Sequence, residues 1–440
     1  MRTLPTETLP TKTLPTKTLL RLATAGSVDD GKSTLVGRLL YDSKSVLADQ
    51  FDAVERVSRD RGLASADLAL LTDGLRSERE QGITIDVAYR YFATAERSFI
   101  LADCPGHVQY TRNTVTGAST ADVVVLLVDA RKGLQEQTRR HLAVASLLRV
   151  PHVVVVVNKI DLVGFDEATY ERVAHEVVTS AASLGLTDVT TIPVSALDGD
   201  NVVEQSVRTP WYDGPSLLTF LETLSPAGEP HSEPLRFPVQ LVIRPQAAGG
   251  EEHRDYRGYA GQIASGLVRP GDPVTVLPSG RTSTVAAIDT ADGELTEAFA
   301  PQSVTLRLTD DVDVARGDLI VTSRSVPSLT QDVDGTIAWL ADHSLAPRTK
   351  VLVKHGTRTV QAMVTEITGR LDLETASLDA ADRLELNDIG HVRLRLASPV
   401  PAEEYLHARA GGSFLLVDAQ DGTTLAAGMV GDALLATASV

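Results

Sequence analysis

One stretch decides the fold: Gly26-Ser27-Val28-Asp29-Asp30-Gly31-Lys32-Ser33, which matches the pattern G-x-x-x-x-G-K-[ST]. It follows Leu20–Ala25, an apolar run that we expect to be a strand, and it precedes a segment with apolar residues at helical spacing. Glycines let the backbone curl around a phosphate, so that its N–H groups and the helix N-terminus point at the anion. Lys32 would reach the β- and γ-phosphates, and the Ser33 hydroxyl would bind Mg²⁺. The stretch therefore predicts a strand, a phosphate-binding loop and a helix.

Working outward, short apolar strands alternate with amphipathic helices up to about residue 225. The further strands expected are Phe99–Asp103, Val123–Asp129, Val153–Asn158 and Thr190–Val194, and the helices are Gln135–Arg149, Asp166–Leu184 and Leu217–Leu224. Strands that alternate with helices indicate a mostly parallel sheet with helices on both faces. The valine runs agree, because such strands are buried on both sides.

The pattern changes after Ser225-Pro226-Ala227-Gly228-Glu229-Pro230, which we interpret as a linker. Beyond it, short strands are separated by turn signals and no helical segment intervenes, which favours two small antiparallel β-barrels. The strands expected are Val239–Ile243, Gly261–Ala264, Val274–Leu277 and Val304–Leu308 in the first barrel, and Lys350–Lys354, Val360–Glu366, His391–Leu396 and Ser413–Val417 in the second. The expected domains are an α/β domain with the phosphate-binding loop at 20–226, a first barrel at 234–326 and a second at 331–440. Residues 1–19 carry a Thr-Leu-Pro-Thr repeat and are expected to be a disordered tail.

A second motif, Asp103-Cys104-Pro105-Gly106-His107, follows the expected strand Phe99–Asp103. An aspartate at the carboxyl end of a strand beside the first one can hold the water shell of Mg²⁺. Gly106 can bring its N–H to the γ-phosphate, where a side chain would block the approach. His107 would then lie near the water that attacks phosphorus and could orient it or accept its proton. By itself this motif would be interpreted as a turn after a strand.

A third motif, Asn158-Lys159-Ile160-Asp161, ends the next strand, and Ser195-Ala196-Leu197 follows Thr190–Val194. The Asp161 carboxylate can accept two hydrogen bonds from the paired donor edge that guanine presents and adenine lacks. A backbone N–H of Ser195-Ala196-Leu197 could add a bond to guanine O6. Three motifs in this order on successive strand ends are a strong combined indication of guanine nucleotide binding.

The stretch Gln81-Gly82-Ile83-Thr84-Ile85-Asp86 lies between the first two motifs. A switch loop whose Thr84 hydroxyl joins the Mg²⁺ when the γ-phosphate is present would make Thr84, with Lys32 and His107, part of the catalytic machinery. The metal ligands are then expected to be Ser33, Thr84 and Asp103. The alternating Ile83, Ile85 and Val87 fit an edge strand equally well when taken alone.

Composition excludes several classes of protein. The net charge of −17 argues against broad, charge-driven adhesion to nucleic acid or anionic membrane. Cys104 is the only cysteine, so an intrachain disulfide is impossible and a reducing, cytoplasmic setting is expected. The longest purely apolar runs are far shorter than the ~20 residues that span a bilayer, so no membrane association is expected.

These motifs together resemble the translation-factor GTPases, and within that superfamily the chain is most similar to the large GTPase subunit of the heterodimeric sulfate adenylyltransferase. The narrower similarity rests on Gly26–Leu40 with Tyr41-Asp42, Asp73–Gln81 with Ile83–Phe92, Gly117–Thr120, Arg139–His141, Arg236–Gln240 and Arg257–Gly261. The resemblance implies that GTP hydrolysis on this chain drives the formation of adenosine 5′-phosphosulfate and pyrophosphate from ATP and sulfate. It also implies a separate, small ATP-binding subunit as partner in a heterodimer or higher assembly.

The chain departs from the family pattern at Val108, at Cys104 and at an insertion, Gln246–Glu252. None is a phosphate contact, but the insertion could alter contact with a partner. No Ser-Gly-Gly-x-Asp signature for a second, ATP-cleaving site occurs, and the adenylylsulfate kinase domain fused to some relatives is not expected.

Two other functions stay open at this point. An elongation-factor-like GTPase delivering aminoacyl-tRNA would need one basic face, which an acidic chain can still carry. The other open function is a GTP-dependent scaffold that does not hydrolyse GTP at a significant rate, and the presence of His107 argues weakly against it.

Overall fold

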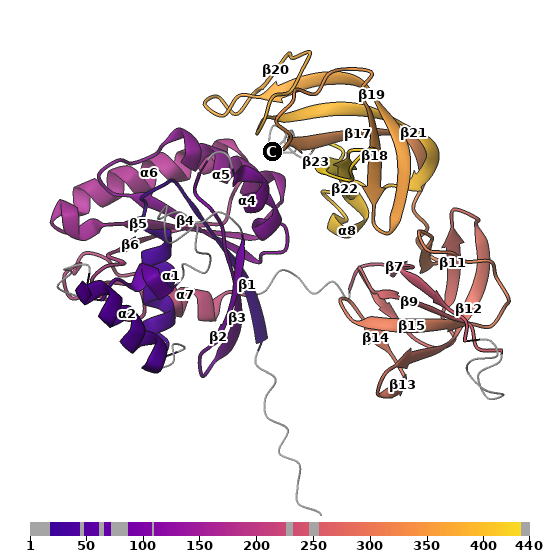
Figure 1. Ribbon diagram of the computed structural model, residues 1–440, viewed down its shortest axis with the longest axis horizontal. Helices are drawn as coiled ribbons and strands as arrows, with labels where there is room; N and C mark the ends of the chain where they lie inside the picture. Colours follow the sequence, from indigo (N-terminus) through magenta and orange to yellow (C-terminus); the bar gives the residue numbers. More distant parts are fainter. Residues whose placement is uncertain are drawn as a thin grey trace, which may run out of the picture.

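A computed structural model describes residues 18–44, 48–60, 66–71, 87–107, 110–225, 232–245 and 255–432. The expected switch stretch Gln81–Asp86, the insertion Gln246–Glu252 and most of the expected tail lie outside these residues. The elements form an α/β domain and two β-sheet domains, which occupy separate regions of the molecule (Figure 1). This arrangement confirms the expected fold class.

The first domain is built on a six-stranded sheet in the order β2-β3-β1-β4-β5-β6. Its elements are β1 (Thr18–Gly26), α1 (Lys32–Asp42), α2 (Ala48–Asp60), η1 (Leu68–Leu71), β2 (Ala88–Ala93), β3 (Arg97–Asp103), α4 (Thr111–Ala118), β4 (Val123–Asp129), α5 (Glu136–Leu147), β5 (His152–Asn158), η3 (Ile160–Val163), α6 (Glu167–Ser183), β6 (Val189–Val194) and α7 (Leu217–Thr223). Strands β3, β1, β4, β5 and β6 pair in parallel, whereas the edge strand β2 is antiparallel to β3.

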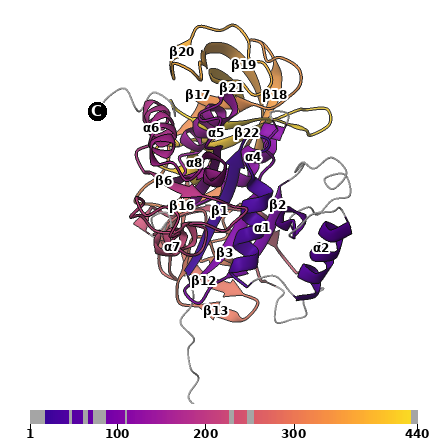
Figure 2. The ribbon, with the colours of Figure 1, turned by 90° about the vertical axis from the view of Figure 1, so that its left-hand side faces the viewer.

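Helices cover both faces of this sheet because its strands are apolar on both sides. All seven residues of β4 are buried. One face packs on α4, α5 and α6 through residues such as Leu142 and Val173, and the other packs on α1 and α7 through residues such as Leu35 and Leu221. Figure 2 shows α1 and α6 on either side of the strands. Because the strands are packed on both faces, their ends are held in place, and the sequence motifs lie at these ends.

The first β-sheet domain has the strand order β7-β16-β11-β12-β15-β9-β8, with β13 paired to β12. Its elements are β7 (Arg236–Pro238), β8 (Leu241–Ile243), β9 (Gly258–Gln262), β10 (Leu267–Val268), β11 (Pro273–Leu277), β12 (Arg281–Thr290), β13 (Gly293–Leu295), β14 (Ala298–Phe299), β15 (Ser303–Leu308) and β16 (Leu319–Thr322). A bridge between Arg236 and Ser265 connects β7 back to the segment after β9, so the sheet curls toward closure.

The second β-sheet domain closes on itself. Its elements are β17 (Leu329–Trp339), β18 (Lys350–His355), β19 (Arg358–Leu371), β20 (Leu378–Asp379), β21 (Ile389–Pro401), α8 (Arg409–Gly412), β22 (Ser413–Val417) and β23 (Thr424–Val430). The order β18-β22-β23-β17-β21-β19 is completed by pairing of β18 with β19, which makes a barrel. β17 begins at Leu329, before the expected start at residue 331, because its first four residues are exposed or only partly buried and give no alternation of buried and exposed positions.

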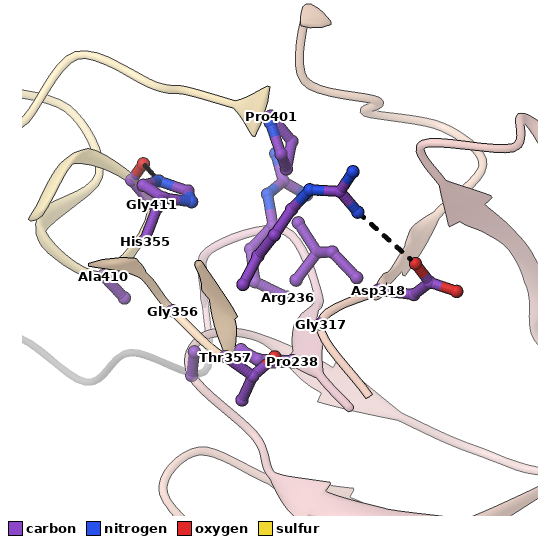
Figure 3. A pocket seen from close by; sticks show the side chains of 13 residues that line it. Arg236, Pro238, Gly317, Asp318, His355, Gly356, Thr357, Pro401, Ala410 and Gly411 are labelled. Carbon is purple, nitrogen blue, oxygen red and sulfur yellow. Dashed lines mark hydrogen bonds and ion pairs between the residues drawn. The ribbon is translucent and has the colours of Figure 1, made fainter. Parts of the chain in front are cut away.

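The two barrels contact each other through a partly buried ion pair. Arg236 donates to both carboxylate oxygens of Glu403, at 2.8 and 2.7 Å. Figure 3 shows the small cavity beside this contact. Next to it, Arg358 pairs with Asp318, and His355 donates to the carbonyl of Gly411. The cavity measures about 30 Å³, which is room for about one water molecule. It is too small to be a ligand site.

Candidate nucleotide site

The carboxyl ends of the parallel strands bring polar residues together at one edge of the sheet. In the strand register Thr24 of β1 lies beside Asp103 of β3, and Asp129 of β4 lies beside Asn158 of β5. Ligands of open α/β sheets bind at this edge. The sheet therefore places the three sequence motifs next to one another, as their positions after successive strands predict.

The loop from Gly26 to Ser33 is already curled in the way that phosphate binding requires. Gly31 has φ 93° and precedes the first residue of α1, and Asp29 has φ 68°. The buried Lys32 ammonium donates to the carbonyls of Gly26 (2.8 Å) and Ser27 (2.9 Å). Its side chain thus spans the loop from the inside. Burial lowers the pKa of Lys32, while Asp30 and Asp103 oppose the shift.

One polar atom in this loop is unsatisfied. The Ser27 hydroxyl is buried and has no hydrogen-bond partner among the described residues. Its backbone N–H, in contrast, donates to the Asp30 carboxylate at 2.7 Å. A buried hydroxyl without a partner is costly, so it indicates that a polar ligand completes the loop.

The segment Asp103–His107 packs directly against this loop. Thr24 donates its hydroxyl hydrogen to Asp103 at 2.8 Å and accepts the N–H of Cys104 at 3.3 Å. A Cβ on Gly106 would lie 2.1 Å from the Lys32 ammonium and 2.6 Å from the Gly26 carbonyl oxygen. Only glycine fits at this position, which brings the 106 backbone beside the lysine.

His107 follows at the surface of the same segment. Its side chain is half-buried, and its ring centroid lies 6.0 Å from that of Tyr110. Cys104, by contrast, is fully buried, and burial raises the pKa of its thiol well above the usual range. Cys104 is therefore a packing residue beneath the loop, whereas His107 is accessible to a ligand.

A single asparagine ties the phosphate loop to the two loops expected at the base. Asn158 donates its amide N–H to the Asp30 carbonyl at 2.7 Å and accepts the Ala196 N–H at 3.0 Å. Lys159 adds a second tie, because its ammonium donates to the Asp29 carbonyl and pairs with Asp129 at 3.1 Å. Three loops that are far apart in the sequence are held in one arrangement.

Some of the groups expected to contact the base already form hydrogen bonds within the protein. Asp161 is half-buried, and none of the hydrogen bonds found among the described residues involves its carboxylate. The N–H groups of Ser195 and Ala196 donate to Asp200 and Asn158. Of the stretch Ser195–Leu197, the N–H of Leu197 is the one left without an acceptor in the described part of the chain. Ile160 is fully buried and anchors the loop.

Sequence reasoning missed several residues that support the site. Asp129 is buried, and it pairs with Arg131 (2.6 Å) as well as Lys159. Burial acts to raise the pKa of Asp129, but hydrogen bonds from Arg131 and Lys159 outweigh it and hold the pKa well below its usual range. Its position at the end of a predicted strand was a signal that could have identified it. No pattern in the sequence identified Arg38, which donates to the carbonyls of Ala196 and Leu197.

A buried histidine also lies beneath the phosphate loop. His141 of α5 is 2% exposed, and its Nε2 lies 3.3 Å from the Gln137 side-chain nitrogen. Burial, together with the nearby Lys32, lowers the pKa of His141 to about 3. Its ring is therefore neutral at ordinary pH and supports the loop without adding charge.

The donor set fits a polyphosphate with a hard cation. The N-terminus of α1, the Lys32 ammonium and the unsatisfied Ser27 hydroxyl all suit phosphate oxygens. Ser33 and Asp103 offer a hydroxyl and a carboxylate, and Mg²⁺ in nucleotide sites takes one or two such ligands and completes its shell with waters and phosphates. Thr84, the third expected metal ligand, lies outside the described residues.

The chain matches two known protein families. Residues 17–227 match the family described as "Elongation factor Tu GTP binding domain", and residues 332–431 match "GTP-eEF1A C-terminal domain-like". Among the helices of the described ranges, we find none with the length and apolar character of a membrane span.

Two curated relatives and one solved structure cover nearly the whole chain. The "Bifunctional enzyme CysN/CysC" of Mycobacterium tuberculosis H37Rv is 55% identical over 94% of this chain and 67% of its own length. "Sulfate adenylyltransferase subunit 1" of Laribacter hongkongensis is 49% identical over 94% of this chain and 85% of its own. The Ski7 GTPase-like domain of S. cerevisiae, bound to GDP and inorganic phosphate, has a TM-score of 0.54 and 19% identity, and the match covers 94% of this chain and 97% of that one. That likeness concerns the fold alone.

Proposed function

The chain belongs to the family of sulfate adenylyltransferase subunit 1, and from this premise we propose how its residues serve the GTPase reaction. The protein is the GTPase subunit of sulfate adenylyltransferase. The elongation-factor alternative is not favoured, because curated relatives that are 46% to 50% identical carry the name "Sulfate adenylyltransferase subunit 1". What the family name leaves open is the role of each residue, the metal and the partner.

Gly26–Ser33 binds the phosphates of GTP in this proposal. The N–H groups at the start of α1 and the Lys32 ammonium neutralise the β- and γ-phosphates. The Ser27 hydroxyl gains the partner that it lacks. Gly106 contributes its N–H near the terminal phosphate, because the absence of a side chain leaves that approach open.

Mg²⁺ would be held by Ser33 and Thr84, with Asp103 acting on its water shell, and when bound it neutralises the charge that develops on the phosphates. Asp103 is kept in place by the Thr24 hydroxyl. His107 then orients the attacking water or accepts its proton, an effect of typically ~10²–10⁴-fold on the rate.

Guanine is selected by Asp161. Its carboxylate has no hydrogen-bond partner in the described part of the chain and can accept from the two donors on the guanine edge. The N–H of Leu197 is the backbone donor that we assign to guanine O6, because Ser195 and Ala196 already donate to other groups. Adenine lacks this donor pair and would leave the carboxylate unpaired.

The name subunit 1 implies a partner subunit. We propose that this partner is a small ATP-binding subunit that joins sulfate to the α-phosphorus of ATP and releases pyrophosphate. Because that anhydride forms uphill, GTP hydrolysis on the present chain would drive it. The observation that carries the proposal is the convergence of three guanine nucleotide motifs at one sheet edge, tied together by Asn158.

An assay of sulfate activation tests the division of labour. We expect the chain alone to hydrolyse GTP slowly and to form no adenosine 5′-phosphosulfate. Affinity purification from the native cytosol should recover a small ATP-binding protein, and adding it should give GTP-dependent product. Product formed by this chain alone, or recovery of tRNA in place of a protein partner, would overturn the proposal.

A further inference from the structure

A second cavity lies where the GTP-binding domain meets the second barrel. Its volume is about 600 Å³, within the ~300–1,000 Å³ that small-molecule sites occupy. Helix α4 forms one wall, and β18, β22, β23 and the segment around α8 form the other (Figure 1). Nothing assigned above to GTP, Mg²⁺ or the base lies in it.

The interface around this cavity is fixed by side chains that bind backbone carbonyls across it. The Tyr405 hydroxyl donates to Leu148 at 2.9 Å, and the Arg112 guanidinium donates to Leu340 at 3.1 Å. Arg409 reaches in the opposite direction, to the carbonyl of Ser119 at 3.4 Å. The walls thus come from two domains that are held together around the opening.

The charges that line the cavity are all of one sign. Arg112, Lys354 and Arg409 line it, and no aspartate or glutamate does. None of the three forms an ion pair with another described residue. This cationic lining stands out in a chain of net charge −17. The two half-buried guanidinium groups donate only to uncharged oxygens, namely backbone carbonyls and, for Arg409, the Tyr405 hydroxyl. They keep an uncompensated charge, which an anion would neutralise.

The rest of the lining is largely apolar. Val115, Leu340 and Met429 line it and belong to the hydrophobic cluster that the two domains share, with the partly buried Leu415 packed against that cluster. Apolar and aromatic surface beside a few charged groups is the composition of a site for an organic ligand with a charged head.

We propose that this cavity binds an organic anion of about nucleotide size. Its aromatic or apolar body would lie against Leu415 and Met429, and its sulfate, phosphate or carboxylate group would pair with Arg112, Lys354 and Arg409. Because α4 begins at Thr111, shortly after His107, the ligand would contact the domain that hydrolyses GTP and the barrel at once. If the ligand binds the GTP-bound and GDP-bound forms with different affinity, nucleotide affinity changes reciprocally.

The test uses the full chain with its nucleotide site saturated by GDP and Mg²⁺. The probe is anilinonaphthalene sulfonate, an aromatic sulfonate whose fluorescence rises in an apolar site, and its uncharged analogue is phenylnaphthylamine. We expect one saturable site for the sulfonate and a clearly weaker one for the analogue. Equal affinity for both probes would overturn the proposal, because the cations would then contribute nothing.

Variants locate the binding site. Lys354→Met and Arg409→Gln should each weaken sulfonate binding about tenfold. Lys350→Met is the matched control, because Lys350 is an exposed lysine of the same strand outside the cavity, and it should leave binding unchanged. Arg409→Gln also removes an interface contact, so Lys354→Met, an exposed position, decides the result if the former fails to fold. Unchanged affinity in Lys354→Met refutes the site.

Discussion

Replacing Asn158 by alanine tests the idea that one amide holds the nucleotide loops together. Asn158 is 2% exposed and makes two hydrogen bonds, to Asp30 and from Ala196. The substitution leaves a buried carbonyl and a buried N–H without partners, at roughly 1–3 kcal/mol each. Partial rehydration reduces the sum, and we expect about 2–4 kcal/mol.

Part of this cost should appear in nucleotide affinity. Without the amide the loops sample other arrangements, and binding must order them again. We expect GTP and GDP to lose affinity together, by at least about 30-fold, which corresponds to about 2 kcal/mol. The measurement is titration of each nucleotide by calorimetry.

Asn201 supplies the matched control. It is also fully buried in this domain, and its amide donates to Pro193 and Thr209 and accepts from Ser206. None of these bonds reaches the phosphate loop, so Asn201→Ala should lower stability and leave nucleotide affinity within about threefold. If Asn158→Ala and Asn201→Ala reduced affinity equally, the loss would reflect general destabilisation and the reasoning would be refuted.

Three further predictions concern single residues. His107→Ala should keep guanine nucleotide affinity and lose GTP turnover by about 10²–10⁴-fold in a phosphate-release assay; unchanged turnover would remove His107 from the mechanism. Asp161→Asn should shift binding preference from guanine to xanthine nucleotides, since the amide donates where the carboxylate accepted, and continued preference for GTP in competition would contradict the assignment. His141 has a pKa lowered to about 3 by burial, so its unfolded form takes up a proton at higher pH than the folded form. The free energy of unfolding must then fall as the pH drops below about 6.5, and His141 alone contributes a loss of about 2 kcal/mol between about pH 7 and about pH 5. In urea unfolding measured across this pH range, His141→Gln should lack that part of the loss. An unaltered pH dependence in His141→Gln would show that another group carries it.

The fold of the first domain could be predicted because its strands are continuous apolar runs. Val123–Asp129 was expected with the bounds that β4 has, since burial on both faces leaves no polar interruption. Helix α4 (Thr111–Ala118) was missed because its sequence Thr-Arg-Asn-Thr-Val-Thr-Gly-Ala shows no apolar stripe, and tertiary packing decides it. Strand β2 was missed for a similar reason, because Tyr89 and Tyr91 are exposed at the sheet edge.

The motifs of the site could be predicted, but the contacts that arrange them could not. Their spacing after strands fixed which loops meet at the edge of the sheet. The tie from Asn158 to Asp30 depends on strand register and on side chains 128 residues apart. The contact between Tyr405 and Leu148 joins residues 257 positions apart in different domains. No local pattern encodes such pairs, because they arise only when the sheet and the barrels are assembled.

The most direct test of the account is a crystal structure of the chain with a non-hydrolysable GTP analogue and Mg²⁺. We expect the terminal phosphate beside the Lys32 ammonium and the Gly106 N–H, and the guanine edge on Asp161. An analogue bound elsewhere, or a strand-end crevice filled by the protein's own side chains, would contradict the account.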